Sequence, residues 1–160
     1  KVKYEAKGDK VKYQVKPVSN FIKGFSQASS RDWNLFLSPE VVWDIDFDTG
    51  AAKANLDLSQ LKLRKIDIES GAAEVLLSLG DNGMETQLDI DAGVSKIKVI
   101  VPESVKLKVR INGALNNSNL EAAGLIPSGD YYVTPADLES DSMVKITLDT
   151  GVSDFELVRQ

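Results

Sequence analysis

A short pattern, an acidic residue followed by any residue and then a glycine, recurs four times and constrains the fold more than any other feature of the sequence. The glycines are Gly50, Gly71, Gly93 and Gly151. The acids two residues before them are Asp48, Glu69, Asp91 and Asp149. Apolar residues stand three and five positions before each glycine and four and six positions after it. The repeat therefore predicts one structural unit that is used four times.

The residues around each glycine alternate between apolar and polar. Before the first glycine the sequence reads Trp-Asp-Ile-Asp-Phe-Asp over residues 43–48, and this alternation is typical of a half-buried strand. A small residue stands two positions after each glycine, an odd number of steps from the apolar residue three before it. A flat strand would place those two side chains on opposite faces. We therefore expect a bend or bulge, where glycine supplies either a positive φ or room for a close approach.

The stretch DIDFDTG, residues 44–50, also suggests a calcium loop. An EF-hand loop needs glycine at position 6 and glutamate at position 12, but these positions hold Thr49 and Asn55 when counted from Asp44. We therefore interpret the pattern as a structural corner. A second interpretation stays open, in which the stacked acids form a negative row that attracts a cation. Its candidate ligands are Asp48, Glu69, Asp91 and Asp149.

The spacing of the glycines indicates stacked units. The first intervals are 21 residues (50 to 71) and 22 residues (71 to 93), and at about 3.3 Å per residue such a unit holds two short strands and two turns. The interval from 93 to 151 is 58 residues, so an insertion interrupts the repeat. The predicted fold class is all-β, a single-domain β-solenoid-like stack or stacked-strand sandwich with repeating glycine corners.

The N-terminal segment differs from the rest in charge. Residues 1–16 alternate around a Lys-Gly-Asp turn signal and predict a hairpin, and residues 17–31 read as a connection. We expect residues 1–32 to pack on a main domain formed by residues 33–160. The first 24 residues hold seven lysines and two acids, so they carry +5 while the remainder carries −10. The lysines either face an anionic surface or protect a strand edge.

The region between the third and fourth glycines contains a basic strand and a loop. Residues 105–111 alternate between apolar and basic, and Asn112-Gly113 is a hairpin turn signal. Residues 113–130 show no strand period, and long irregular loops are often functional. The apolar residues of this loop either pack on the core or form a partner-binding patch. They are Leu120, Leu125 and Ile126.

Composition excludes several kinds of chemistry. The sequence contains no cysteine and no histidine, which removes disulfides, the usual zinc sites and histidine-based triads. The net charge of −5 argues against a nucleic-acid partner. No apolar run is long enough to span a bilayer and no signal peptide is visible. The chain begins with lysine, which leaves room for a membrane tether upstream. We expect no catalytic residue and no cofactor.

Two stretches carry a resemblance to a known family. They are VVWDIDFDTGAAKANLDLSQLKLRKIDIESGAAEVLLSL (residues 41–79) and LDIDAGVSKIKVIVPESVKLKV (residues 88–109). The Trp43-Asp44 strand, the LDLS of residues 56–59, Val101-Pro102 and the terminal DTGVSDFEL add to it. Over roughly residues 33–157 the chain resembles the bacterial toastrack domains. These occur in DUF2154/DUF4097-type proteins and in the C-terminal part of LiaF-like envelope-stress proteins.

The resemblance implies a β-rich, solenoid-like fold with no known catalytic residues. It also implies an extracytoplasmic or membrane-associated place in the bacterial cell envelope. The first hypothesis is a non-enzymatic interaction or sensing module, linked to the cell-wall stress response, with an envelope partner such as a membrane kinase. One alternative is a glycan-binding or carbohydrate-active module. The other is a scaffold that self-associates through uncapped ends of the stack.

Overall fold

The computed structural model describes residues 2–7, 10–15 and 35–160. The chain forms two compact units, Lys1–Leu35 and Phe36–Gln160. In the first unit, β1 (Val2–Lys7) and β2 (Lys10–Val15) pair antiparallel, which confirms the predicted hairpin. The predicted connection at 17–31 lies outside the described residues. The division falls three residues after the expected boundary, and the packing of residues 1–32 on the main domain stays a prediction.

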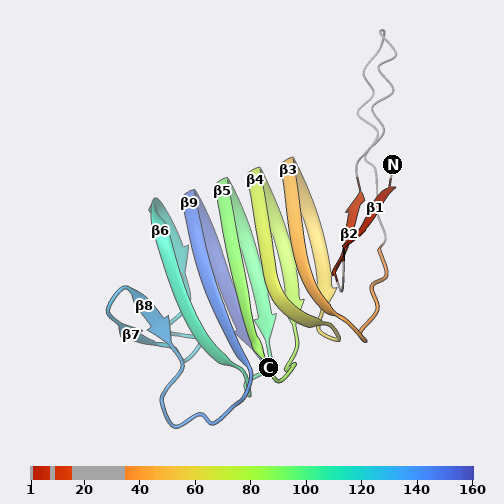
Figure 1. Ribbon diagram of the computed structural model, residues 1–160. Coiled ribbons are helices and arrows are strands. Elements are labelled where there is room, and N and C mark those ends of the chain that lie inside the picture. The colour runs from red at the N-terminus through yellow and green to blue at the C-terminus, as the bar shows by residue number, and fades with distance from the viewer. Residues whose placement is uncertain (1, 8–9, 16–34) are drawn as a thin grey trace, which may run out of the picture. The chain divides into compact units, whose positions relative to one another are not determined.

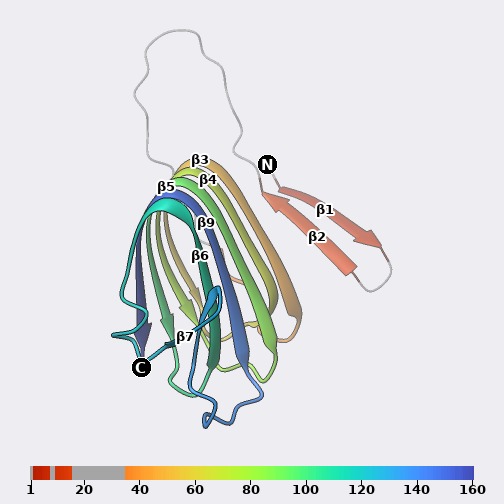
Figure 2. The same ribbon diagram turned by 90° about the vertical axis from the view of Figure 1, so that its left-hand side faces the viewer.

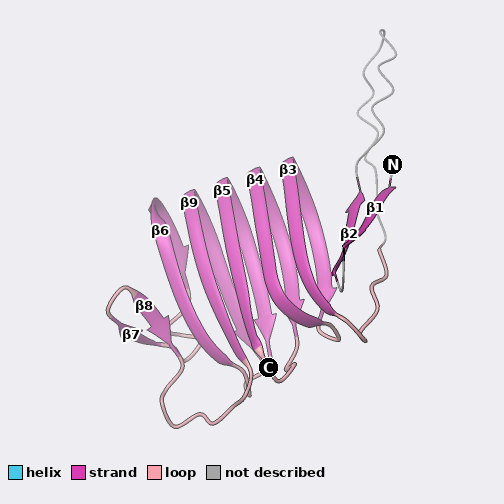
Figure 3. Ribbon diagram, viewed as in Figure 1, coloured by secondary structure: helices cyan, strands magenta, loops and turns pink. Residues whose placement is uncertain are grey.

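The second unit is a single sheet. Its strands are β3 (Val42–Leu58), β4 (Lys62–Leu79), β5 (Glu85–Val101), β6 (Lys106–Ser118), β7 (Ile126–Ser128), β8 (Tyr131–Val133) and β9 (Met143–Arg159). They lie side by side in the order β3-β4-β5-β9-β6-β8-β7 (Figure 1). The five long strands are parallel, and β8 runs antiparallel to β6 and β7. The described residues form strands, turns and loops without a helix, so the all-β prediction is confirmed (Figure 3).

Each of the five long strands bends over on itself, and the bends stack to form a row of arches (Figure 2). We call the part of a strand before the bend its first arm and the part after it its second arm. The arms stack in register, so that Ile66 faces Leu88 and Leu88 faces Ile146. The predicted stack of glycine-cornered units is therefore present.

The core lies between the first and second arms. The apolar positions that the repeat marks before and after each glycine are buried in β4, β5 and β9, as the sequence predicts. Those on the first arms are Ile66, Ile68, Leu88, Ile90, Ile146 and Leu148, and those on the second arms are Val75, Leu77, Ile97, Val99, Phe155 and Leu157. Because side chains of both arms point inward, the bend converts one long strand into two facing layers.

Three of the four corner glycines, Gly71, Gly93 and Gly151, are required by a close approach between strands. A Cβ atom on Gly71 would lie 2.7 Å from the carbonyl oxygen of Gly50, and one on Gly93 would lie 2.8 Å from that of Gly71. A Cβ atom on Gly151 would lie 2.7 Å from the carbonyl oxygen of Gly93. Among the described glycines, positive φ occurs at Gly83, Gly113, Gly124 and Gly129, and none of these is a corner of the repeat. Of the two reasons weighed for glycine, close approach is therefore the correct one.

Two expectations for the region after residue 111 are wrong. Asn112-Gly113 does not turn a hairpin, because β6 continues through it to Ser118, with Gly113 at the bend at a φ of 151°. Residues 113–118 are therefore strand rather than loop. β6 is a fifth arch that lacks the acid-x-glycine pattern. In the sheet, β9 lies between β5 and β6. The sequence between Gly93 and Gly151 therefore contains the β6 arch, which lies on the other side of β9 from β5.

Candidate functional site

The four acids of the repeat form a row on the outer surface of the first arms. Asp48 faces Glu69, Glu69 faces Asp91, and Asp91 faces Asp149 across neighbouring strands. All four side chains are exposed. Asn112 continues the row on β6, and its side-chain amide donates to the Asp149 carboxylate at 2.7 Å. Neighbouring strands are about 4.8 Å apart, so the row places like charges next to one another.

The interpretation of this row as a cation site stays a prediction. Within residues 35–160 and the described parts of the hairpin, no three side chains of the His, Cys, Asp and Glu types are grouped so that they could hold a metal ion. The acids instead stand singly, one on each strand. The cation interpretation of the sequence therefore gains no support from their arrangement.

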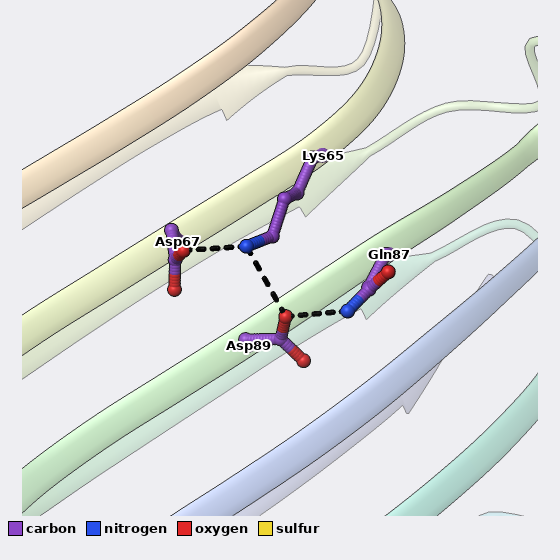
Figure 4. Close-up of polar contacts among 4 residues, drawn as sticks. All are labelled: Lys65, Asp67, Gln87 and Asp89. Carbon is purple, nitrogen blue, oxygen red and sulfur yellow. Dashed lines mark hydrogen bonds and ion pairs between the residues drawn. The ribbon is translucent and has the colours of Figure 1, made fainter.

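Beside the acid row, a lysine on β4 lies between an aspartate of its own strand and an aspartate of β5. Lys65 Nζ donates to Asp67 at 2.6 Å and lies 3.7 Å from Asp89, which also accepts from the Gln87 amide at 2.6 Å (Figure 4). The hydrogen bond to Asp67 is the main cause that raises the pKa of the Lys65 ammonium group. Exposed pairs of this kind contribute little stability individually. Of these contacts, the one between Lys65 and Asp89 joins β4 to β5, and it lies beside a second row of facing acids, Asp46, Asp67 and Asp89.

On the second arms, oppositely charged residues face one another on neighbouring strands. Lys53, Glu74, Lys96 and Asp154 face one another in succession on β3, β4, β5 and β9, so the sign of the charge alternates from strand to strand. Lys53 Nζ lies 2.9 Å from the Glu74 carboxylate. Two residues further along β5 and β9, Lys98 Nζ lies 2.8 Å from Glu156.

A network of hydroxyl groups joins three loops at the open end of the arches. The Asp81 carboxylate accepts hydrogen bonds from the Ser104 hydroxyl at 2.6 Å and from the Ser142 hydroxyl. The backbone N–H of Gly83 donates to Ser142 Oγ at 2.7 Å. The hydrogen bonds from Ser104 and then Ser142 lower the pKa of the Asp81 carboxyl group. The network holds the turn after β4 against the turns before β6 and β9, which is a structural role.

The three apolar residues of the candidate partner loop differ in exposure. Leu120 and Leu125 are 1% and 2% exposed and belong to the core, whereas Ile126 on β7 is 49% exposed. The Asn119 side chain fixes the start of the loop, because it donates to the Leu157 carbonyl at 2.9 Å and accepts from the Leu157 N–H at 2.8 Å. The three residues therefore do not form one apolar patch, and Ile126 alone remains available to a partner.

Among the described aromatic side chains only Phe36 is classed as exposed, so they do not form the cluster of rings on an outer face that the glycan-binding alternative needs. Phe155 is buried in the core, and Trp43 and Phe47 pack half-buried against it from the inner side of the arch. The ring of Tyr131 on β8 is covered by Lys108, whose Nζ lies 4.0 Å from the ring centre.

The two ends of the stack differ. At one end, β8 pairs with β6 at Lys108 and Val109 and covers part of its edge. At the other end β3 pairs with β4, and the described residues of this unit offer no strand on its outer side. The inward side chains of the first arm of β3 are consequently half-buried, although their neighbours in β4 are fully buried. They are Trp43, Ile45 and Phe47. We call this side of β3 the β3 edge.

A stack of parallel arches with glycine corners defines the class of protein. Residues 1–100 match the family Toast_rack_N, described as the N-terminal domain of toast_rack, DUF2154. The chain therefore belongs to the Toast_rack_N family, as the resemblance in its sequence predicts. The matched range begins at residue 1 and so includes the N-terminal hairpin.

One solved structure shares the fold along the whole chain. It is a crystal structure of a "putative cell adhesion protein" from Clostridium sporogenes, with a TM-score of 0.84 and 21% sequence identity. The alignment covers 100% of this chain and 76% of the other. No curated protein matches the sequence. In the described parts of the chain, no helix is long and apolar enough to cross a membrane.

Proposed function

We propose that this chain is a non-enzymatic interaction module of the bacterial cell envelope. The observation that carries the proposal is the β3 edge, where the part of the parallel sheet formed by residues 35–160 ends with its apolar inner side chains half-buried. An open sheet edge is a ready template for pairing with another chain. The module acts by presenting this edge on a rigid stack.

Membership of the Toast_rack_N family and the fold shared with a protein described in terms of cell adhesion support an envelope location. We propose an extracytoplasmic or membrane-associated position and a link to the cell-wall stress response. The partner class is an envelope protein, with a membrane kinase as one candidate.

Crosslinking of the native protein in its own cells tests this function. The cells are treated with a crosslinker, with and without a cell-wall antibiotic, and adducts are identified by mass spectrometry. The proposal predicts a reproducible adduct with another envelope protein. Adducts between copies of this chain alone would replace it with the self-associating scaffold. Recovery of cytosolic proteins alone would overturn the envelope assignment.

A further inference from the structure

We infer that the β3 edge binds an extended segment of a partner protein in which basic residues alternate with apolar ones. The segment adds as one more parallel strand and continues the arch. This inference rests on the proposed function and names the chemistry of the partner. Three observations carry it: the unfinished apolar rows, the charge on the outer surface of β3, and the open space at Gly50.

The apolar rows of the core run across the strands and stop at β3. Ile45 faces Ile66, and Phe47 faces Ile68. Ile66 and Ile68 are fully buried, but their β3 neighbours are only half-buried because no described strand of this unit covers the outer side. An added strand with apolar side chains at alternate positions would extend both rows by one member. It would also pair the outward N–H and C=O groups of β3.

Further apolar side chains stand exposed where β3 begins. Phe36 is 96% exposed, and Val41 and Val42 are also exposed. Apolar side chains scattered singly on a surface are ordinary, but these lie within six residues of the open edge and widen the apolar surface next to it. They are positioned to contact residues at the start of an added strand.

Charge selects among the candidate partners. The outer face of the first arm of β3 carries Asp44, Asp46 and Asp48, of which Asp44 forms a bidentate pair with Arg64 of β4. Asp46 and Asp48 are exposed. Natural edges are usually protected by lysine, whereas this edge is acidic. A strand with lysine or arginine at alternate positions would place positive charges beside Asp46 and Asp48, which on their β4 side face only the acids Asp67 and Glu69.

A second copy of β3 fits less well. Antiparallel pairing of the first arms alone, centred on Asp46, would place aspartates opposite aspartates, and like charges directly opposite one another are destabilising. The acidic first arm therefore disfavours a symmetric dimer that pairs through the first arms. A basic, amphipathic strand from another protein is the occupant that the edge favours.

Gly50 supplies the third observation. In the stack, each corner glycine makes room for the corner carbonyl of the strand before it, as Gly71 does for Gly50. Gly50 itself has nothing within 4 Å of its Cβ position. The described stack therefore gives no packing reason for glycine there. A strand added beside β3 that follows the bend would place its own corner carbonyl at this position and would require glycine.

A synthetic peptide of fifteen residues tests the inference. It alternates lysine with valine or isoleucine and carries a glycine at its centre, and its affinity for the full chain is measured by fluorescence anisotropy. We expect saturable binding that weakens with added salt, because exposed charge pairs are screened. Hydrogen exchange should slow at alternate amides of residues 42–49. The absence of binding at millimolar peptide would overturn the inference, as would protection of these amides before peptide is added.

Charge reversal provides the matched control. We expect the double variant Asp46→Lys with Asp48→Lys to bind the lysine peptide on the order of tenfold more weakly, since each cross-strand charge pair contributes modestly. It should gain affinity for a peptide with glutamate in place of lysine. The control makes the same change of charge away from the edge, at two exposed acids, Glu121→Lys with Glu139→Lys. Equal loss of affinity in both double variants would show non-specific attraction and overturn the inference.

The variant Gly50→Ala tests the path over the bend. We expect it to fold with an unchanged or slightly higher melting temperature and to lose affinity for the peptide. Unchanged affinity would overturn strand addition beyond the first arm. If crosslinking in cells recovers an envelope protein but maps it to another surface, the proposed function stands and the β3 inference fails. If the peptide binds and no envelope partner is recovered, the proposed function fails instead.

Discussion

Replacing a single corner glycine by alanine should have opposite effects at two positions of the same repeat. At Gly71 the new methyl group would stand 2.7 Å from the Gly50 carbonyl oxygen, whereas an ordinary contact begins at 3.4 Å. The neighbouring strand must therefore move by about 0.7 Å, the difference between these distances, against the ladder hydrogen bonds that join β3 and β4. At Gly50 the methyl group meets nothing within 4 Å.

The magnitudes decide the sign at each position. Overpacking of this kind costs about 1–3 kcal/mol. Alanine in place of glycine also restricts the unfolded chain and stabilises by about 0.4–1 kcal/mol where the native backbone accepts it. We expect Gly71→Ala to lower the free energy of unfolding by about 1–2 kcal/mol. Gly50→Ala should leave it unchanged or raise it by up to about 1 kcal/mol.

Thermal and urea unfolding, followed by circular dichroism, measure both variants. For a chain of this size each kcal/mol corresponds to a shift in melting temperature of about 2–4 °C. We therefore expect a separation of at least several degrees between the two proteins. Gly93→Ala and Gly151→Ala should behave like Gly71→Ala, because their methyl groups would meet a carbonyl oxygen at 2.8 and 2.7 Å. Equal stability of Gly50→Ala and Gly71→Ala would refute close approach as the reason for glycine.

Three further predictions concern the surface and the loops. Because the pKa of the Asp81 carboxyl group is lowered in the folded protein, its carboxylate stabilises the fold above the unfolded pKa of 3.8, and this stabilisation is lost as the pH falls through the folded pKa. In acid-denaturation curves, the difference in free energy of unfolding between wild type and Asp81→Asn should therefore become smaller as the pH falls. Leu120→Ala should cost about 2–5 kcal/mol in urea unfolding because the side chain is buried, whereas the exposed Ile126→Ala should change stability by less than about 0.5 kcal/mol. Glu69→Gln should raise the free energy of unfolding by roughly 0.2–1 kcal/mol at low salt, because it removes a like charge from the middle of the acid row.

Each of these has a result that would contradict it. A stability gap for Asp81→Asn that stays constant from neutral pH to pH 3 would show that the serine hydrogen bonds do not favour the carboxylate. Equal losses in Leu120→Ala and Ile126→Ala would contradict the division of the loop into a buried and an exposed part. A gain in Glu69→Gln that persists undiminished at high salt would show that repulsion along the acid row is not its cause.

The arches that carry the acid-x-glycine pattern could be predicted from the sequence. Period-two alternation assigned the inward residues, and the odd step across the glycine required a bend. The choice between positive φ and close approach could not be made, because it depends on the neighbouring carbonyl, which belongs to a residue 21, 22 or 58 positions away. The local pattern of the sequence therefore predicts the bend. The need for glycine at the bend follows from the register between neighbouring strands.

The fifth arch illustrates what local signals miss. Asn112-Gly113 carries a turn signal, but the ladder that pairs β6 with β9 over twelve register positions keeps the strand continuous. The order β5-β9-β6 depends on pairing between the end of the chain and its middle, which no local pattern specifies. The Asp81 network was missed for the same reason, since its partners Ser104 and Ser142 come from two other loops.

Site-specific photo-crosslinking in living cells tests the central claim most directly. A photoreactive residue is placed at position 46 on the β3 edge or, in a matched protein, at position 121 in the exposed turn after β6. We expect an adduct with another envelope protein from position 46 and none from position 121. Adducts from position 121 alone, or equal adducts from both positions, would contradict the β3 edge as the surface through which this protein acts.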